Sequence, residues 1–163
     1  MPVKNDIVQA KQLIETADLD AVVNRLVMTE KWPHKEAILA IRQYRNYLFL
    51  RKKYPDYNLP PSIDIDEAWH AHILHTRDYH AFCKQIFSNE DDQYLHHDPH
   101  IVKEGTMERL GQLFEQTQKL YYQEFGEYIY QIRGRTFFKK CIDKIRDKLI
   151  KKFPVLSTMA RSP

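Results

Sequence analysis

Glycine is scarce in this sequence, with four residues in 163, and long stretches contain neither glycine nor proline. A protein with many turns between strands needs more of both, so the scarcity disfavours a β architecture and favours helices. No apolar run approaches the ~18–20 residues that a transmembrane helix requires. The apolar fraction of 43% and the aromatic fraction of 12% still suffice for a core, which argues against global disorder.

Several other signals are missing as well. The two cysteines, Cys83 and Cys141, are too few for a disulfide framework and are expected to be free thiols. The first residues lack the zones of a secretory signal, so we expect a soluble, cytoplasmic protein, although some export routes leave no readable N-terminal signal. There is no glycine-rich phosphate loop and no spacing typical of a nucleophile with its base. A net charge of +3 is too mild to indicate a nucleic-acid partner.

Apolar residues recur at helical spacing along most of the chain. We therefore predict an all-α fold, an irregular bundle of about five or six helices around a long central helix. One helical domain is expected over residues 1–153, followed by a flexible tail at 154–163. Helices are expected at about 5–16, 33–53, 64–87, 106–125 and 136–153, with a further one that carries Leu19 to Val27.

The start of the long central helix has the clearest signal. A proline-rich loop that ends at Pro61 precedes it, because prolines prevent regular pairing there. Asp64 as N-cap and Glu67 three residues later match a capping box, and Ile63 can act as a hydrophobic staple. The sequence therefore predicts one continuous helix from this point to about Phe87.

Histidines are concentrated in the segment 64–100, where six of the eight fall between His70 and His97. With ~100° per residue, His70 lies about 40° from Asp66 and one turn further on. The carboxylate and the imidazole can therefore meet at one metal ion or hydrogen-bond each other. His72 lies about 160° from His70, so a regular helix cannot aim both at a single ion. His72 is either a buried, hydrogen-bonded histidine of the core or a ligand of a second site.

Asp66 and His70 alone do not complete a coordination sphere, since a catalytic zinc has three protein ligands and a water. The loop with His96 and His97 is the expected donor of the rest. Adjacent histidines in an extended stretch point in opposite directions, so normally one would bind, and we favour His97. We predict a transition-metal site drawn from Asp66, His70, His72, His96 and His97, with zinc first and iron second. The alternative is a solvated polar loop whose histidines bind no metal.

The order of these residues resembles a known motif. Asp-x-x-Trp-His-x-His, then an aliphatic pair, Tyr and Cys at this spacing, is the core motif of the glycine-rich domain-containing protein-like family. His96-His97-Asp98-Pro99 is similar to a His-His-x-Pro element in small bacterial relatives. The resemblance covers Trp32 to Pro99 and implies an α-helical domain of poorly defined biochemistry. This chain lacks the glycine-rich tail of the plant members, so a function tied to that tail is not carried over. The positions that the resemblance singles out are Asp66, Trp69, His70, His72, Tyr79, Cys83 and His97.

A basic amphipathic segment follows at 136–153. From Arg133 to Lys152 there are nine Lys or Arg against two Asp, and apolar residues recur at helical spacing. Such a helix either docks on its own bundle with a solvated lysine face, makes weak contact with an anionic membrane surface, or enters the groove of a partner protein.

Two functions of different classes follow from these features. The first is a small helical metalloprotein whose metal, if one position is open, activates water or oxygen for hydrolysis or oxidation. Its substrate would be an unidentified small molecule or protein. The second is a non-enzymatic interaction module, in which the histidine cluster is structural and the basic helix contacts a partner or a membrane. Measured metal content separates the two.

Overall fold

The computed structural model describes residues 4–87, 93–97 and 107–133 of the chain. Contacts divide the chain into two compact units, residues 1–132 and 133–163. The helices described below belong to the first unit. The predicted helix at 136–153 and the predicted tail lie outside the described residues, so they stay predictions.

The described part of the chain contains six helices and no strand, which confirms the predicted all-α fold. Within that part, no helix is both long and apolar enough to cross a membrane. The helices are α1 (Lys4–Thr16), α2 (Asp20–Met28), α3 (His34–Lys53), α4 (Ile63–Ile73), α5 (Thr76–Ile86) and α6 (Met107–Phe125).

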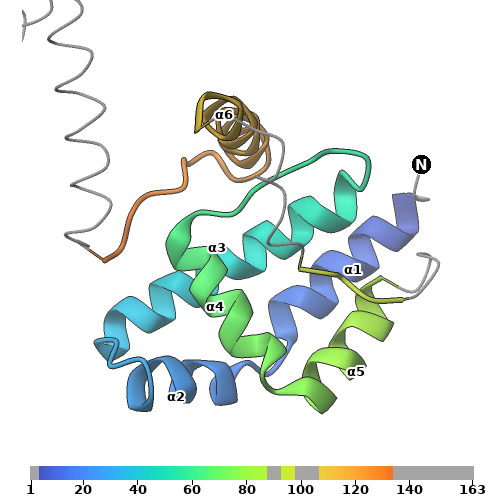
Figure 1. Ribbon diagram of the computed structural model, residues 1–163. Helices are drawn as coiled ribbons and strands as arrows, with labels where there is room; N and C mark the ends of the chain where they lie inside the picture. The colour runs from blue at the N-terminus through green and yellow to red at the C-terminus, as the bar shows by residue number, and fades with distance from the viewer. Residues whose placement is uncertain (1–3, 88–92, 98–106, 134–163) are drawn as a thin grey trace, which may run out of the picture. The chain divides into compact units, whose positions relative to one another are not determined.

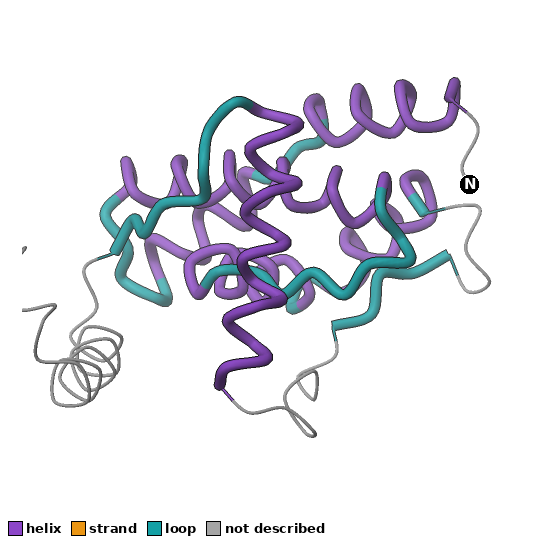
Figure 2. Tube along the Cα trace, turned by 90° about the horizontal axis from the view of Figure 1, so that it is seen from above, coloured by secondary structure: helices purple, strands orange, loops and turns teal. Residues whose placement is uncertain are grey.

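Helix α3 is the centre of the bundle and packs against α1, α2, α4 and α6. Figure 1 shows α3 and α4 crossing in the middle, with α1, α2 and α5 around them. Seen from above in Figure 2, α6 lies across the helices beneath it. Tyr44, Tyr47 and Leu48 lie fully buried on α3, at the spacing that keeps one helical face in the core. Burial of side chains of this size contributes roughly 1.5–3 kcal/mol each.

The proline-rich loop between α3 and α4 is held from two sides. The Tyr47 hydroxyl of α3 donates a hydrogen bond to the carbonyl of Leu59 at 2.8 Å. The Thr117 hydroxyl of α6 donates to the carbonyl of Pro60 at 3.1 Å. Since both carbonyls are bound to side chains of buried residues, the loop has a fixed path and delivers the chain to the start of α4.

The predicted capping box at the start of this helix is wrong. The N-cap is Ser62, whose hydroxyl accepts a hydrogen bond from the backbone N–H of Ile65 at 3.3 Å. Asp64 is instead 2% exposed, and its carboxylate accepts a hydrogen bond from the backbone N–H of Ile132 at 2.8 Å. The side chain that the pattern assigned to the cap therefore holds a distant segment of the chain.

The prediction of one continuous helix over about 64–87 is also wrong, because helix α4 ends before Leu74 and His75 and the chain continues as a separate helix, α5. The backbone of His75 leaves the helical region, with φ −86° and ψ 62°. The break brings Trp69 and Tyr79 together, so that the indole N–H donates to the Tyr79 hydroxyl at 2.8 Å. In one straight helix these residues would be about 15 Å apart along the axis. The longest helix of the described residues is α3 instead.

Candidate metal site

Asp66 and His70 lie one turn apart on α4, with their side chains half-exposed. His70 Nδ1 is 3.4 Å from Asp66 Oδ2 and 2.7 Å from the backbone carbonyl oxygen of Asp66. A carbonyl can only accept a hydrogen bond, so in this conformation Nδ1 carries the proton. The other ring nitrogen, Nε2, then has a lone pair available in the neutral ring.

His97 supplies the third side chain from the separate segment 93–97. Its Nε2 is 2.7 Å from Asp66 Oδ1, and its side chain is 16% exposed. The imidazole packs against two rings of α4, with centroid distances of 4.6 Å to Trp69 and 4.3 Å to His70. These contacts fix the position of His97 beside the acidic residue although it comes from an irregular segment.

The segment that carries His97 is anchored through Tyr79. The hydroxyl of Tyr79 donates to the carbonyl of Leu95 at 2.6 Å, while it accepts from the Trp69 indole on α4. Burial raises the pKa of Tyr79 well above its usual value, so the hydroxyl keeps the proton that it donates. One buried hydroxyl therefore joins α4, α5 and the segment 93–97.

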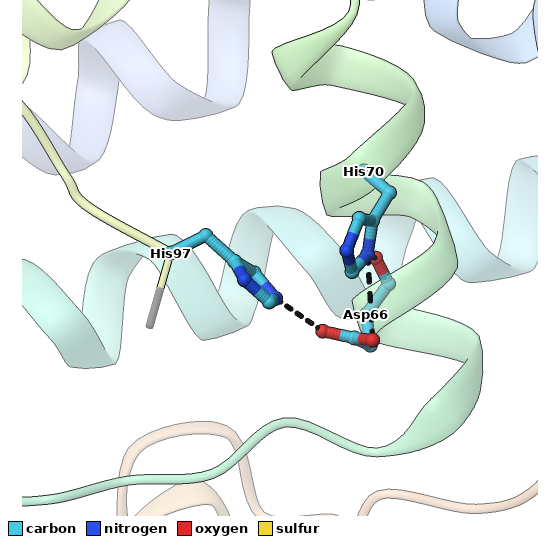
Figure 3. A group of neighbouring side chains, drawn as sticks. All are labelled: Asp66, His70 and His97. Carbon is cyan, nitrogen blue, oxygen red and sulfur yellow. Dashed lines mark hydrogen bonds and ion pairs between the residues drawn. The ribbon is translucent and has the colours of Figure 1, made fainter. Parts of the chain in front are cut away.

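Asp66, His70 and His97 each offer one ligand atom, and these atoms lie within 4.8 Å of one another. Figure 3 shows the two residues of α4 and the single histidine of the other segment converging on the same space. The distance of 2.7 Å between His97 Nε2 and Asp66 Oδ1 is typical of a hydrogen bond. Two atoms bound to one tetrahedral zinc at ~2.0–2.1 Å would be roughly 3.3 Å apart. For a metal to replace this hydrogen bond, these two atoms would move apart by roughly 0.6 Å, and ligand atoms that are up to 4.8 Å apart would approach each other by up to roughly 1.5 Å.

A cleft of about 630 Å³ opens beside this group. Its walls come from the C-terminal end of α3, the proline-rich loop, the start of α4, one residue of α6 and the segment 93–97. Volumes of this size are typical of small-molecule sites. Its lining residues include Arg51, Asp56, Ile63, Asp66, Trp69 and Leu110.

The structure does not bring His72 to this group. His72 is 2% exposed, and its Nδ1 is 3.0 Å from the Tyr44 hydroxyl of α3, with which it shares a hydrogen bond. Burial, with smaller contributions from the charges of His75 and Arg45, lowers the pKa of His72 to about 4. The two histidines of the His-x-His pair thus face opposite sides of α4, as their angular separation predicts. The partner Tyr44 comes from a distant helix and has no local signal in the sequence.

His96 and Cys83 lie apart from the group as well. The ring of His96 contacts that of Tyr94, with centroids 4.8 Å apart, and the side chain is exposed at the edge of the cleft. Cys83 is a fully buried cysteine that forms no disulfide among the described residues. Sequence reasoning missed Arg51, which lines the cleft. No local pattern distinguishes this arginine from the lysines that follow it.

The fold and the cluster define a class, an all-α protein with a carboxylate and two imidazoles at the wall of a cleft. The family model described as UCP032817-like matches residues 9–159, and the chain belongs to this family. No curated protein and no solved structure matches the chain significantly. The resemblance to the glycine-rich domain-containing protein-like family stays a prediction.

Proposed function

We propose that this protein binds a divalent transition metal through Asp66, His70 and His97, with zinc as the first expectation and ferrous iron as the second. One observation carries the proposal: ligand atoms from α4 and from the separate segment 93–97 lie within 4.8 Å of one another. Imidazole nitrogens and a carboxylate oxygen are donors that suit both zinc and non-haem iron.

The donor set fits a catalytic site better than a closed structural one. Three protein ligands leave at least one coordination position open. The cleft beside Asp66 and His70 gives a small molecule access to that position. A metal held there would supply Lewis acidity for hydrolysis or, with iron, oxidation chemistry. A small metalloenzyme that acts on a ligand of the cleft is therefore the function that the site supports best.

A hydrogen-bonded cluster without a metal accounts for the same contacts. In that case the proton between His97 and Asp66 would hold the segment 93–97 on α4, and the cluster would be structural. This alternative predicts no binding of zinc or iron above background. The non-enzymatic interaction module depends on the basic segment 136–153, which lies outside the described residues, and it stays a prediction.

Metal retention by single variants tests the proposal. Protein purified without a His tag, incubated with zinc or with ferrous iron under anaerobic conditions and then desalted, should retain about one ion per chain by elemental analysis. Asp66→Ala, His70→Ala and His97→Ala should each lose most of it. His34→Ala is the matched control, because His34 is an exposed histidine of α3 outside the cluster.

Two results would contradict the proposal. The first is retention of less than about a tenth of an ion per chain by the wild type after loading with either metal. The second is wild-type retention by His70→Ala, since that protein would bind its metal elsewhere. Circular dichroism of each variant confirms that a loss of metal does not come from a loss of the helical fold.

A further inference from the structure

Three consecutive basic residues end helix α3, and they differ in their partners. Lys52 forms an ion pair with Asp6 at 3.2 Å, and Lys53 forms one with Glu124 at 2.6 Å. Arg51 forms no ion pair with any carboxylate of the described residues. Its side chain is half-buried and lines the cleft, and its Nε is buried without a hydrogen-bond partner in the described part of the chain. This arginine therefore lies beside a cavity and has one donor, Nε, without a partner among the described residues.

Arg51 also lies near the candidate metal site. Burial raises the pKa of Tyr47 to about 12, while the charge and hydrogen bond of Arg51 lower it and the charge of Asp66 raises it. Both charged groups therefore act on the same tyrosine hydroxyl, yet among the described residues they form no ion pair with each other. The arginine and the carboxylate both line the same cleft.

With a divalent ion bound, the charges of the cleft favour an anion, because Arg51 and the ion exceed the charges of Asp56 and Asp66 by one. Without the ion, the two carboxylates exceed Arg51 by one, so an anion would depend on direct contact with the guanidinium. Arg51 is the only arginine or lysine among the described residues that line the cleft. Ile63, Trp69 and Leu110 contribute apolar surface to the same cleft. A guanidinium presents a planar fork of donors that matches the oxygens of a carboxylate or a phosphate.

We infer that the cleft binds a small organic anion, and that Arg51 holds its carboxylate or phosphate group. The inference deepens the proposed function, because it names the ligand class of the same cleft, and it rests on that function for the metal at the other end. The contact with Arg51 itself does not need the metal. The ligand would place its charged end on Arg51, its apolar part against Trp69, and its reactive end toward Asp66 and His70.

A purely structural role for Arg51 gives different expectations. In that case the guanidinium would serve only to hold the Tyr47 hydroxyl and to offset the charge of Asp66. Arg51→Gln would then lower the stability of the protein, and anions would bind the variant as they bind the wild type. Affinity for a small anion is therefore the measurement that separates the two roles.

The experiment uses the full chain without metal, at low ionic strength, and follows backbone amide signals by two-dimensional NMR. The probes are succinate, inorganic phosphate and the neutral butane-1,4-diol. We expect succinate or phosphate to bind and the diol to leave the spectrum unchanged. Arg51→Gln should weaken the affinity for the anion at least tenfold. Arg51→Lys keeps the charge but loses the planar fork of donors, so its affinity should lie between those of the wild type and Arg51→Gln. Arg42→Gln is the control, because Arg42 lies on the same helix, pairs with Glu127 and does not line the cleft.

Each outcome decides the inference separately from the metal. Anion binding that Arg51→Gln weakens and Arg42→Gln preserves supports it, even if the metal-loading experiment fails. The inference is overturned if neither succinate nor phosphate binds. It is also overturned if Arg51→Gln binds the anions as tightly as the wild type does, even if the protein holds zinc. A melting temperature for each folded variant shows whether a lost affinity comes from the cleft or from unfolding.

Discussion

Tyr79→Phe is the substitution that tests most sharply how the candidate site is held together. It removes one oxygen atom and keeps the ring, so packing against the neighbouring side chains changes little. The lost hydroxyl accepts from the Trp69 indole at 2.8 Å and donates to the carbonyl of Leu95 at 2.6 Å. Trp69 and Leu95 are both buried, so water does not readily replace either hydrogen bond.

The magnitude follows from these two contacts. A buried donor or acceptor that is left without its partner costs roughly 1–3 kcal/mol, and two such groups are left here, so Tyr79→Phe should lower the free energy of unfolding by about 2–6 kcal/mol. The same change frees the segment 93–97, which positions His97. Loss of a group that hydrogen-bonds directly to a metal ligand typically weakens a metal site 10- to 100-fold, and Tyr79 acts one step further out, through the backbone of the segment that carries His97. We therefore expect about a tenfold increase in the Kd for zinc, the lower end of this range.

Two assays measure these effects. Urea unfolding followed by far-UV circular dichroism gives the free energy of unfolding, and competition with a chromophoric chelator gives the Kd for zinc. Tyr122→Phe is the control, because Tyr122 is an exposed tyrosine of α6 outside the cleft. If Tyr79→Phe unfolds at the same urea concentration as Tyr122→Phe, the buried hydroxyl does not anchor the segment, and the reasoning is refuted.

Two further predictions concern the core. Because burial lowers the pKa of His72 to about 4 from an ordinary 6.5, the unfolded chain takes up a proton in this range that the folded chain does not. The contribution of neutral His72 to the free energy of unfolding is therefore complete above pH 6.5 and is lost as the pH falls toward 4. The loss should amount to about 3 kcal/mol in urea unfolding, and His72→Gln should remove that share of the pH dependence. Lys52 is buried and pairs with Asp6, so Asp6→Ala should cost about 3–5 kcal/mol in the same assay, whereas the double variant Asp6→Ala/Lys52→Met should recover most of it. An unchanged pH profile in His72→Gln, or a double variant no more stable than Asp6→Ala, would count against these assignments.

The sequence predicted best what depends on the geometry of a single helix. Asp66 and His70 are four residues apart inside α4, so the helical repeat alone sets their proximity. The same repeat separates His72 from His70 and turns it toward the core. That His97 lies beside Asp66 and His70 was expected because the two residues of the helix needed a further ligand and the following loop contains histidines.

The features that the sequence did not reveal are set by tertiary contacts. No glycine or proline marks the break at His75, which allows Tyr79 to return to Trp69. The acidic residue at the predicted cap, Asp64, is bound to Ile132, sixty-eight residues away, so Ser62 caps the helix instead. Arg51 looks like its lysine neighbours until the positions of their distant carboxylates are known.

The most direct test of the central claim is the position of a bound ion. Crystals of the zinc-loaded protein, measured at the zinc absorption edge, should show one anomalous peak in the space between Asp66, His70 and His97. A carboxylate oxygen and an imidazole nitrogen of each histidine should lie at about 2.0–2.2 Å from it. A structure of the loaded protein with no peak there, and with the hydrogen bond between His97 and Asp66 intact, would contradict the assignment of this cluster as a metal site.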